Sequence, residues 1–166
     1  MKTKFIFSML SGLVLMSGCS DTLNHLPGVD PWMDGNPSDF ASFAANAAEG
    51  PVVMINLLKY REKSLDGDGT GAEAYARYGA LASPFVEQHG GEMIWLGEAR
   101  EHLVGDTTYD WDSVLLVSWP ARQNLLDLTE DEGYQEIAHH RQNGLERTML
   151  IALDEQFSNF SVPDQE

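Results

Sequence analysis

The stretch that decides the fold is Pro51-Val-Val-Met-Ile-Asn-Leu-Leu-Lys-Tyr60. It is a short apolar run with β-branched residues, introduced by Gly50-Pro51, which is typical of a fully buried strand. Pro51 has no N–H for a ladder and suits a first strand position. Asn56 interrupts the run, and a buried amide without partners costs about 1–3 kcal/mol. Asn56 therefore either ties the fold together or points into a polar pocket.

Further elements follow around this strand. A Pro just after a cap residue predicts a helix over residues 37–49. Apolar periodicity and turn signals then predict these elements: a helix over 72–89, a long strand over 92–105, a strand over 113–119, helices over 120–128 and 134–141 separated by a break, and a strand over 148–153. The order β-α-β-β-α-β predicts an α+β fold of the ferredoxin-like type, with helices on one face of an antiparallel sheet. This domain is expected over residues 37–155, followed by an acidic tail over 156–166.

The other face of such a sheet has no helices to cover it. The alternation of the strands nominates Met54, Asn56 and Leu58, together with Met93 and Trp95, for this bare face. A contiguous exposed apolar face marks an interaction site. We therefore expect a homodimer.

Composition limits the possible functions. The chain has 166 residues, 26 acidic against 10 basic side chains, and a formal charge of −16. A length of this size predicts a single domain. The acidic surface repels nucleic acid and anionic lipid, so we expect no nucleic-acid partner and no electrostatic attachment to a membrane.

The N-terminus has the layout of a bacterial export signal. Residues 1–4 are basic, residues 5–16 are apolar, and Ser17-Gly18-Cys19 follows. The apolar run is too short to span a membrane. Residues 16–19 resemble the lipobox of bacterial lipoproteins, in which the Cys becomes the lipidated first residue; a plain secretion signal is the alternative. The interpretation divides the segment into a signal peptide over 1–18 and a tether over 19–36, with Cys19 carrying the lipid anchor. Ser20 resembles the sorting signal for the outer membrane, which implies its periplasmic face.

Two motifs suggest metal binding and fail on inspection. Asp66-Gly-Asp-Gly-Thr-Gly71 resembles the opening of a calcium loop, but Arg77 stands where the bidentate Glu is required. The adjacent His139 and His140 project about 100° apart on a helix and cannot chelate one ion. We expect no metal site, and no cofactor, because dinucleotide and P-loop fingerprints are absent from the sequence.

The densest polar cluster lies at the end of the second C-terminal helix. Glu136 precedes His140 by one turn and can orient its imidazole, while Arg141 shares a stripe with Tyr134 and Ile137 and suits a substrate carboxylate. A plain helix end favours the same residue types. We predict that one cavity for a small anionic or aromatic molecule is lined as follows: Asn56, Tyr78, Trp95, His140 and Arg141. His89, in the last turn of its helix, is a further candidate for this ligand.

Several motifs together resemble a known family. They are residues 51–60, Tyr75 to Tyr78, His89-Gly-Gly91 with Trp95 to Gly97, and Tyr134-Gln-Glu-Ile-Ala-His-His-Arg141 with Leu145-Glu146. Over about residues 37–153 the chain is similar to the domain of unknown function 1330. The resemblance implies the dimeric α+β barrel superfamily, in which two sheets pack face to face. That superfamily contains monooxygenases, haem enzymes, isomerases and plain ligand binders, so the fold does not settle the function.

Two functions are therefore expected. The first is an envelope lipoprotein that binds a small molecule without turnover. The alternative is a cofactor-independent enzyme of the monooxygenase or isomerase kind, acting on a small organic acid or aromatic compound. In that enzyme His140 or His89 is the acid–base group, Arg141 clamps the anion and Asn56 donates a hydrogen bond.

Overall fold

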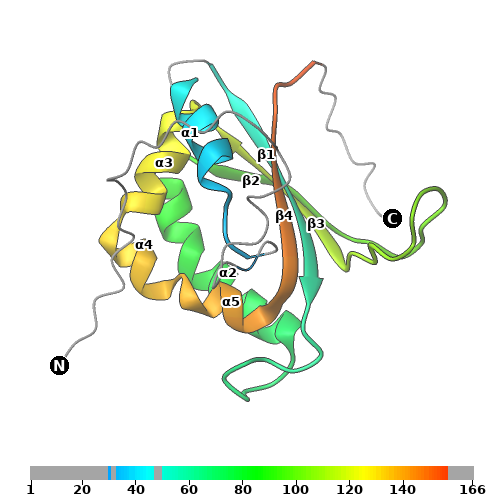
Figure 1. Ribbon diagram of the computed structural model, residues 1–166. Helices are drawn as coiled ribbons and strands as arrows, with labels where there is room; N and C mark the ends of the chain where they lie inside the picture. Colours follow the sequence, from blue (N-terminus) through cyan, green and yellow to red (C-terminus); the bar gives the residue numbers. More distant parts are fainter. Residues whose placement is uncertain (1–29, 31–32, 47–49, 157–166) are drawn as a thin grey trace, which may run out of the picture.

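The computed structural model describes residues 30, 33–46 and 50–156 (Figure 1). Within these residues four strands form one antiparallel sheet in the order β2-β3-β1-β4. Their bounds are Val52–Tyr60 for β1, Glu92–Glu98 for β2, Ser113–Trp119 for β3 and Leu145–Leu153 for β4. The strand predicted for residues 51–60 thus lies inside the sheet and pairs on both sides, which confirms the predicted ferredoxin-like α+β arrangement.

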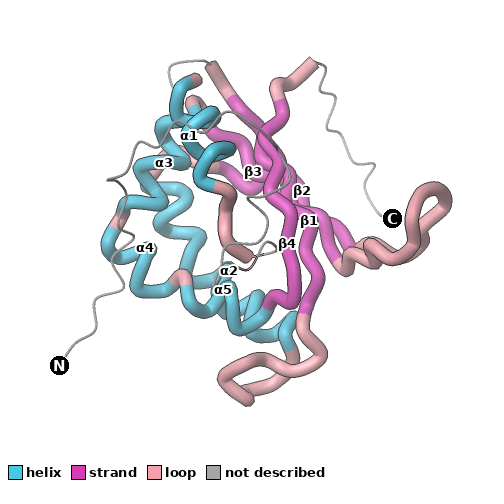
Figure 2. Tube along the Cα trace, viewed as in Figure 1, coloured by secondary structure: helices cyan, strands magenta, loops and turns pink. Residues whose placement is uncertain are grey.

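The helices lie on one side of this sheet (Figure 2). Their bounds are Pro37–Ala45 for α1, Gly71–Gln88 for α2, Arg122–Glu130 for α3, Glu132–Ile137 for α4 and His139–Gly144 for α5. Local side chains explain their starts. Asn36 caps α1, and Thr70 caps α2 in a reciprocal box with Glu73.

The core lies between the helices and the covered face of the sheet. Val52, Met54, Trp119 and Leu128 form one buried cluster. Leu58 is also fully buried. The prediction that Met54, Asn56 and Leu58 belong to the bare face is therefore wrong. Because side chains alternate with a period of two, a shift of one residue exchanges the faces, and both alternating sets of this strand are largely apolar.

The bare face carries the other set of β1. Paired residues of antiparallel strands point to the same side, so the register defines three rows from β2 to β4. These rows are Glu92–Ser118–Val53–Leu153, Trp95–Leu116–Ile55–Ile151 and Gly97–Val114–Leu57–Met149. Two of the three are apolar throughout. No helix of the described residues covers them.

Strand β2 is shorter than predicted. It ends at Glu98 instead of residue 105, and residues 99–112 form a loop. Asp112 precedes β3 at this end of the sheet: its N–H donates to the carbonyl of Leu58 and its carboxylate accepts from the N–H of Tyr60. Its carbonyl oxygen accepts from the N–H of Ala99, one residue beyond the end of β2.

The C-terminal helices also differ from their prediction. The expected break over 129–133 is reduced to Asp131, whose carboxylate caps α4 by accepting from the N–H of Tyr134. A second break falls at Ala138, so His139 and Arg141 belong to the separate helix α5. Strand β4 then starts at Leu145, three residues earlier than predicted, because Leu145 is fully buried opposite Tyr60.

Several predictions concern residues outside the described part of the chain. The signal peptide, Cys19, most of the tether and the tail from residue 157 belong to this group. In the segments that the structure describes, no helix combines the length and apolarity needed to cross a membrane.

Candidate functional site

A line of tyrosine rings lies between α2 and its neighbours. The ring of Tyr75 is 5.6 Å from that of Tyr60 and 5.5 Å from that of Tyr78. Tyr78 meets Tyr134 of α4 edge-on at 6.5 Å. Tyr75 and Tyr78 are one turn apart on α2, so the helical period directs both toward the interior.

The tyrosine hydroxyls are held in their neutral form. The hydroxyls of Tyr78 and Tyr134 are 2.6 Å apart and share one hydrogen bond. Burial raises the pKa of Tyr75 to about 12, and the positive charge of Arg141 opposes this rise. Burial raises the pKa of Tyr78 as well, and Tyr134 adds to the effect. At neutral pH these groups donate hydrogen bonds and do not act as bases.

Arg141 extends from α5 toward these tyrosines. Its guanidinium donates to the hydroxyl of Thr148 on β4 over 3.2 Å. Among the described residues, no carboxylate lies within ion-pair distance of Arg141. Two other half-buried or buried cations differ in this respect, since Lys59 pairs with Asp110 and Arg122 pairs with Asp154. Arg61, which is half-buried as well, donates to the backbone carbonyl oxygen of Gln142. Arg141 is thus a half-buried positive charge, and the only hydrogen bond of its guanidinium within the described residues is with a neutral hydroxyl.

Asn56 lies on the covered face of the sheet and is partly buried. Its amide nitrogen donates to the carbonyl oxygens of Met54 and Leu115, over 3.3 and 3.4 Å. Both bonds are long, and both join neighbouring backbone. Within the described residues, no donor reaches the side-chain oxygen of Asn56. The amide nitrogen of Asn56 therefore bonds to the backbone of the sheet, and its side-chain oxygen remains available to accept a hydrogen bond from a ligand.

The helical layer leaves the β4 edge of the covered face open. Leu150 pairs with Asn56 and so points to the helical side, yet 43% of its surface is exposed. Ala152, next but one along β4, is exposed too. Thr148 and Arg141 lie at the inner side of this opening. The candidate site consists of Arg141, Thr148, Asn56 and Leu150, with Tyr75 and Tyr78 behind Arg141.

Three predicted site residues lie elsewhere. Trp95 pairs with Leu116 on the bare face and packs over Gly97, so the prediction that it shares a cavity with Asn56 is wrong. His89 contacts Asp131 at 3.1 Å and joins the end of α2 to the start of α4. His140 stacks on His139 at 4.0 Å and has an electrostatic interaction with Asp66. His139 is exposed, and its Nδ1 lies 2.8 Å from the carbonyl oxygen of Glu136.

Sequence reasoning missed two members of the site. Thr148 was assigned only to the last strand, and Leu150 had no role. Both alternate with Met149 along β4, so the period of a strand could have placed them on one face. The partner strand and its register were needed to say which face.

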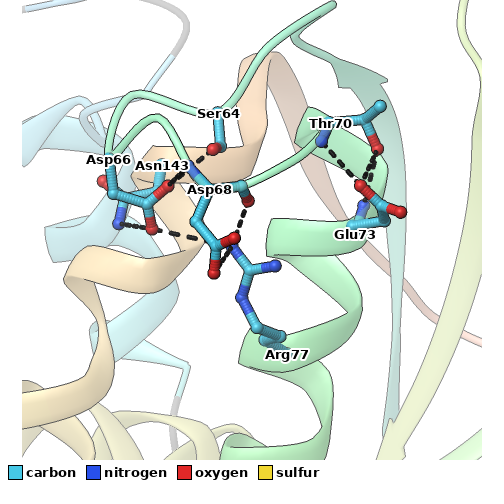
Figure 3. A network of polar contacts seen from close by, with 7 residues as sticks. All are labelled: Ser64, Asp66, Asp68, Thr70, Glu73, Arg77 and Asn143. Carbon is cyan, nitrogen blue, oxygen red and sulfur yellow. Dashed lines mark hydrogen bonds and ion pairs between the residues drawn. The ribbon is translucent and has the colours of Figure 1, made fainter.

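The β1–α2 loop holds a second polar network (Figure 3). Asp66 accepts hydrogen bonds from the hydroxyl of Ser64, the N–H of Asp68 and the amide of Asn143. Arg77 of α2 forms ion pairs with Asp66 and Asp68 at 3.6 and 3.9 Å. The arginine supplies the positive charge that a cation would bring. No group of acidic, His or Cys side chains among the described residues is suited to a metal ion.

A shallow hollow lies beside this network on the outer side of α2. Its lining is Asp68, Gly69, Glu73, Ala76, Arg77 and Ala80. The charged groups of the hollow are already engaged, Glu73 with Thr70 and Arg77 with the two aspartates. The charged groups of the hollow are therefore less available to a ligand than the guanidinium of Arg141.

Comparison with known proteins places the chain in a family. The family model for a domain of unknown function, DUF1330, matches residues 67–154, slightly more than half of the chain. The protein belongs to the DUF1330 family. No curated protein matches the sequence of this DUF1330 chain.

Several solved structures are similar to this chain. Methylated RPA0582 is 36% identical, with a TM-score of 0.70 over 75% of this chain and 95% of its own. RPA0582 from Rhodopseudomonas palustris, described as a protein of unknown function, is 35% identical, with a TM-score of 0.71 over 76% and 98%. A dimeric protein of unknown function with a ferredoxin-like fold, from Bacteroides fragilis, is 9% identical, with a TM-score of 0.45 over 64% and 98%.

The tyrosine cluster predicts how stability depends on pH. The folded state keeps Tyr75 and Tyr78 protonated above the ordinary tyrosine pKa of about 10. This contribution to stability is complete below about pH 10 and is lost as pH rises toward about 12. Near-ultraviolet absorbance should therefore detect fewer phenolates than the five tyrosines of the chain at about pH 11 while the fold persists. Five phenolates in a folded protein at that pH would contradict this assignment.

Proposed function

We propose that this DUF1330 protein binds a small organic anion, without turnover, at Arg141 on the open β4 edge. The observation that carries the proposal is the lack of a carboxylate partner for Arg141 among the described residues. A half-buried guanidinium costs free energy unless an anion compensates it. A ligand carboxylate supplies that compensation, since a guanidinium binds it through two parallel hydrogen bonds.

The residues around Arg141 indicate which groups the ligand carries besides its carboxylate. Thr148 holds one edge of the guanidinium, which orients the remaining N–H groups. The exposed side chain of Leu150 supports an apolar portion of the ligand at the β4 edge. The free oxygen of Asn56 can accept a hydrogen bond from it. These groups together favour a carboxylate attached to an aromatic or aliphatic body.

The protonation states of the tyrosines support the proposal of binding without turnover. An enzyme of the proposed alternative class needs a base or nucleophile beside the substrate. Tyr75 and Tyr78 remain protonated at neutral pH, so they are poor bases. His140 interacts with Asp66 of the β1–α2 loop instead. The geometry therefore supports a binding role over the cofactor-independent enzyme.

Removal of the guanidinium tests this proposal. Arg141→Ala should weaken the binding of small aromatic and aliphatic carboxylates about 10- to 100-fold, the worth of a charge-assisted contact. Titration calorimetry with a carboxylate panel, and with matched primary amides of the same compounds, measures the effect. The melting temperature should change by only about a few degrees, because Arg141 contacts one neutral hydroxyl.

Arg100→Ala is the matched control. Arg100 lies outside the site, and 83% of its side chain is exposed beside Glu98. Its loss should leave binding unchanged. Equal affinity of the Arg141→Ala variant and the parent protein, or equal affinity for carboxylates and their amides, would refute the anion site.

We also propose that two copies pack through their bare sheet faces. The two apolar rows that include Ile55 and Leu57 lack a covering layer among the described residues. An apolar sheet face of this kind calls for a partner. A second copy offers the same surface, as a two-fold interface requires.

A charge placed on this face should separate the two copies. Ile151 is 39% exposed on β4, so Ile151→Asp is tolerated by the monomer but buries an unpaired carboxylate in the dimer. Light scattering at about micromolar concentration should find a dimer for the parent and a monomer for the variant. Leu65→Asp is the control, because Leu65 is 62% exposed in the β1–α2 loop, away from the bare face. This variant should remain dimeric. A parent protein that is monomeric would refute the proposal.

The third part of the proposal concerns location. Residues 1–19 have the layout of a lipoprotein signal, so we propose a lipid anchor at Cys19 and the periplasmic face of the outer membrane. Metabolic labelling with a fatty-acid analogue in a bacterial host should mark the parent protein and leave Cys19→Ser unlabelled. Label retained by Cys19→Ser would contradict this assignment.

A further inference from the structure

Residues 99–112, here called the arm, connect β2 and β3 and carry an apolar tip. Leu103 and Val104 are 86% and 96% exposed. They are adjacent, and the following Gly105 has a φ of 109°, a conformation that favours glycine. Burial of such side chains is favourable, and the isolated subunit gains none of that free energy.

Ion pairs hold the base of the arm in place. Asp110 contacts both Lys59 and Arg147, and Asp112 lies 3.0 Å from the ammonium group of Lys59. The guanidinium of Arg147 also lies over the ring of Trp111, 5.4 Å from its centre. Lys59 and Arg147 face each other across β1 and β4 at the end of the bare face. The arm is thereby fixed to the bare face before any partner binds, which lowers the entropic cost of an interface.

The side of the sheet on which the arm projects indicates what it can contact. The arm leaves the sheet on the side opposite to the helices and extends well beyond it (Figure 1). It therefore projects past the same face that carries the apolar rows of β1 and β4. Whatever covers this face comes within reach of the arm.

We propose that the arm clasps a second copy of this chain, with Leu103 and Val104 buried against the partner subunit. The inference rests on the proposed face-to-face homodimer. In a two-fold dimer each arm reaches across to the other subunit, so each contact of the arm occurs twice in the interface. An anionic bilayer is the poorer occupant, because the arm carries four acidic side chains and one arginine: Glu101, Asp106, Asp110, Asp112 and Arg100.

The double variant Leu103→Asp, Val104→Asp tests the clasp. Sedimentation equilibrium of the full chain, in a detergent matched to the solvent density, measures the dimer dissociation constant. Loss of the buried tips should raise this constant about 100-fold or more. Leu65→Asp is the control for an exposed aliphatic residue outside the arm, and it should leave the constant unchanged. Circular dichroism should be the same for all three proteins, since the substituted side chains are exposed.

The outcomes separate the clasp from the dimer on which it rests. A parent protein that stays monomeric refutes both. A dimeric parent with an unchanged constant in the double variant refutes the clasp and leaves the sheet interface standing. Vesicle binding that the double variant loses, with dimerisation intact, also refutes the clasp and assigns the tip to lipid.

Discussion

The double pairing of β1 is the constraint on which the rest of the structure depends. This strand bonds to β3 on one side and to β4 on the other, so each of its side chains belongs to one of two faces. Val52, Met54 and Leu58 anchor the helices. Val53, Ile55 and Leu57 belong to the other face, and Ile55 and Leu57 lie in its two apolar rows. A strand apolar on both faces needs a layer on each side, and the described helices supply one layer only.

The candidate site follows from the same geometry. The short helix α5 ends in Gly144, which approaches Gly71 and Tyr75 so closely that a Cβ atom there would lie 2.6 Å from the Gly71 carbonyl oxygen. This contact sets the place where β4 begins and where Arg141 meets Thr148. In the part of the chain that the structure describes, this edge of β4 remains exposed at Leu150. A positive charge, a hydroxyl and an exposed apolar side chain come together there, as an anion with an apolar body requires.

Charge pairing separates structural cations from the functional candidate. Lys59 and Arg147 fasten the arm through Asp110, whose pKa their contacts lower to about 2, Lys59 contributing most. Below its ordinary pKa this carboxyl group would lose that stabilisation, so the network holds throughout the neutral range. Arg122 likewise binds Asp154 at the end of β4. Arg141 is different, because in a strongly acidic chain it has no carboxylate partner among the described residues.

The sequence by itself determined the order of elements, the central strand and the tyrosine stripe of α2, and it nominated Arg141 as a site residue. These features depend on local periodicity and on caps such as Thr70, which act within a few residues. Only the tertiary structure decided which face of β1 is covered and that Trp95 and Asn56 lie on opposite faces. These outcomes depend on strand register. A shift of one residue reverses every side chain of a strand, and no local signal prevents that shift when both faces are apolar.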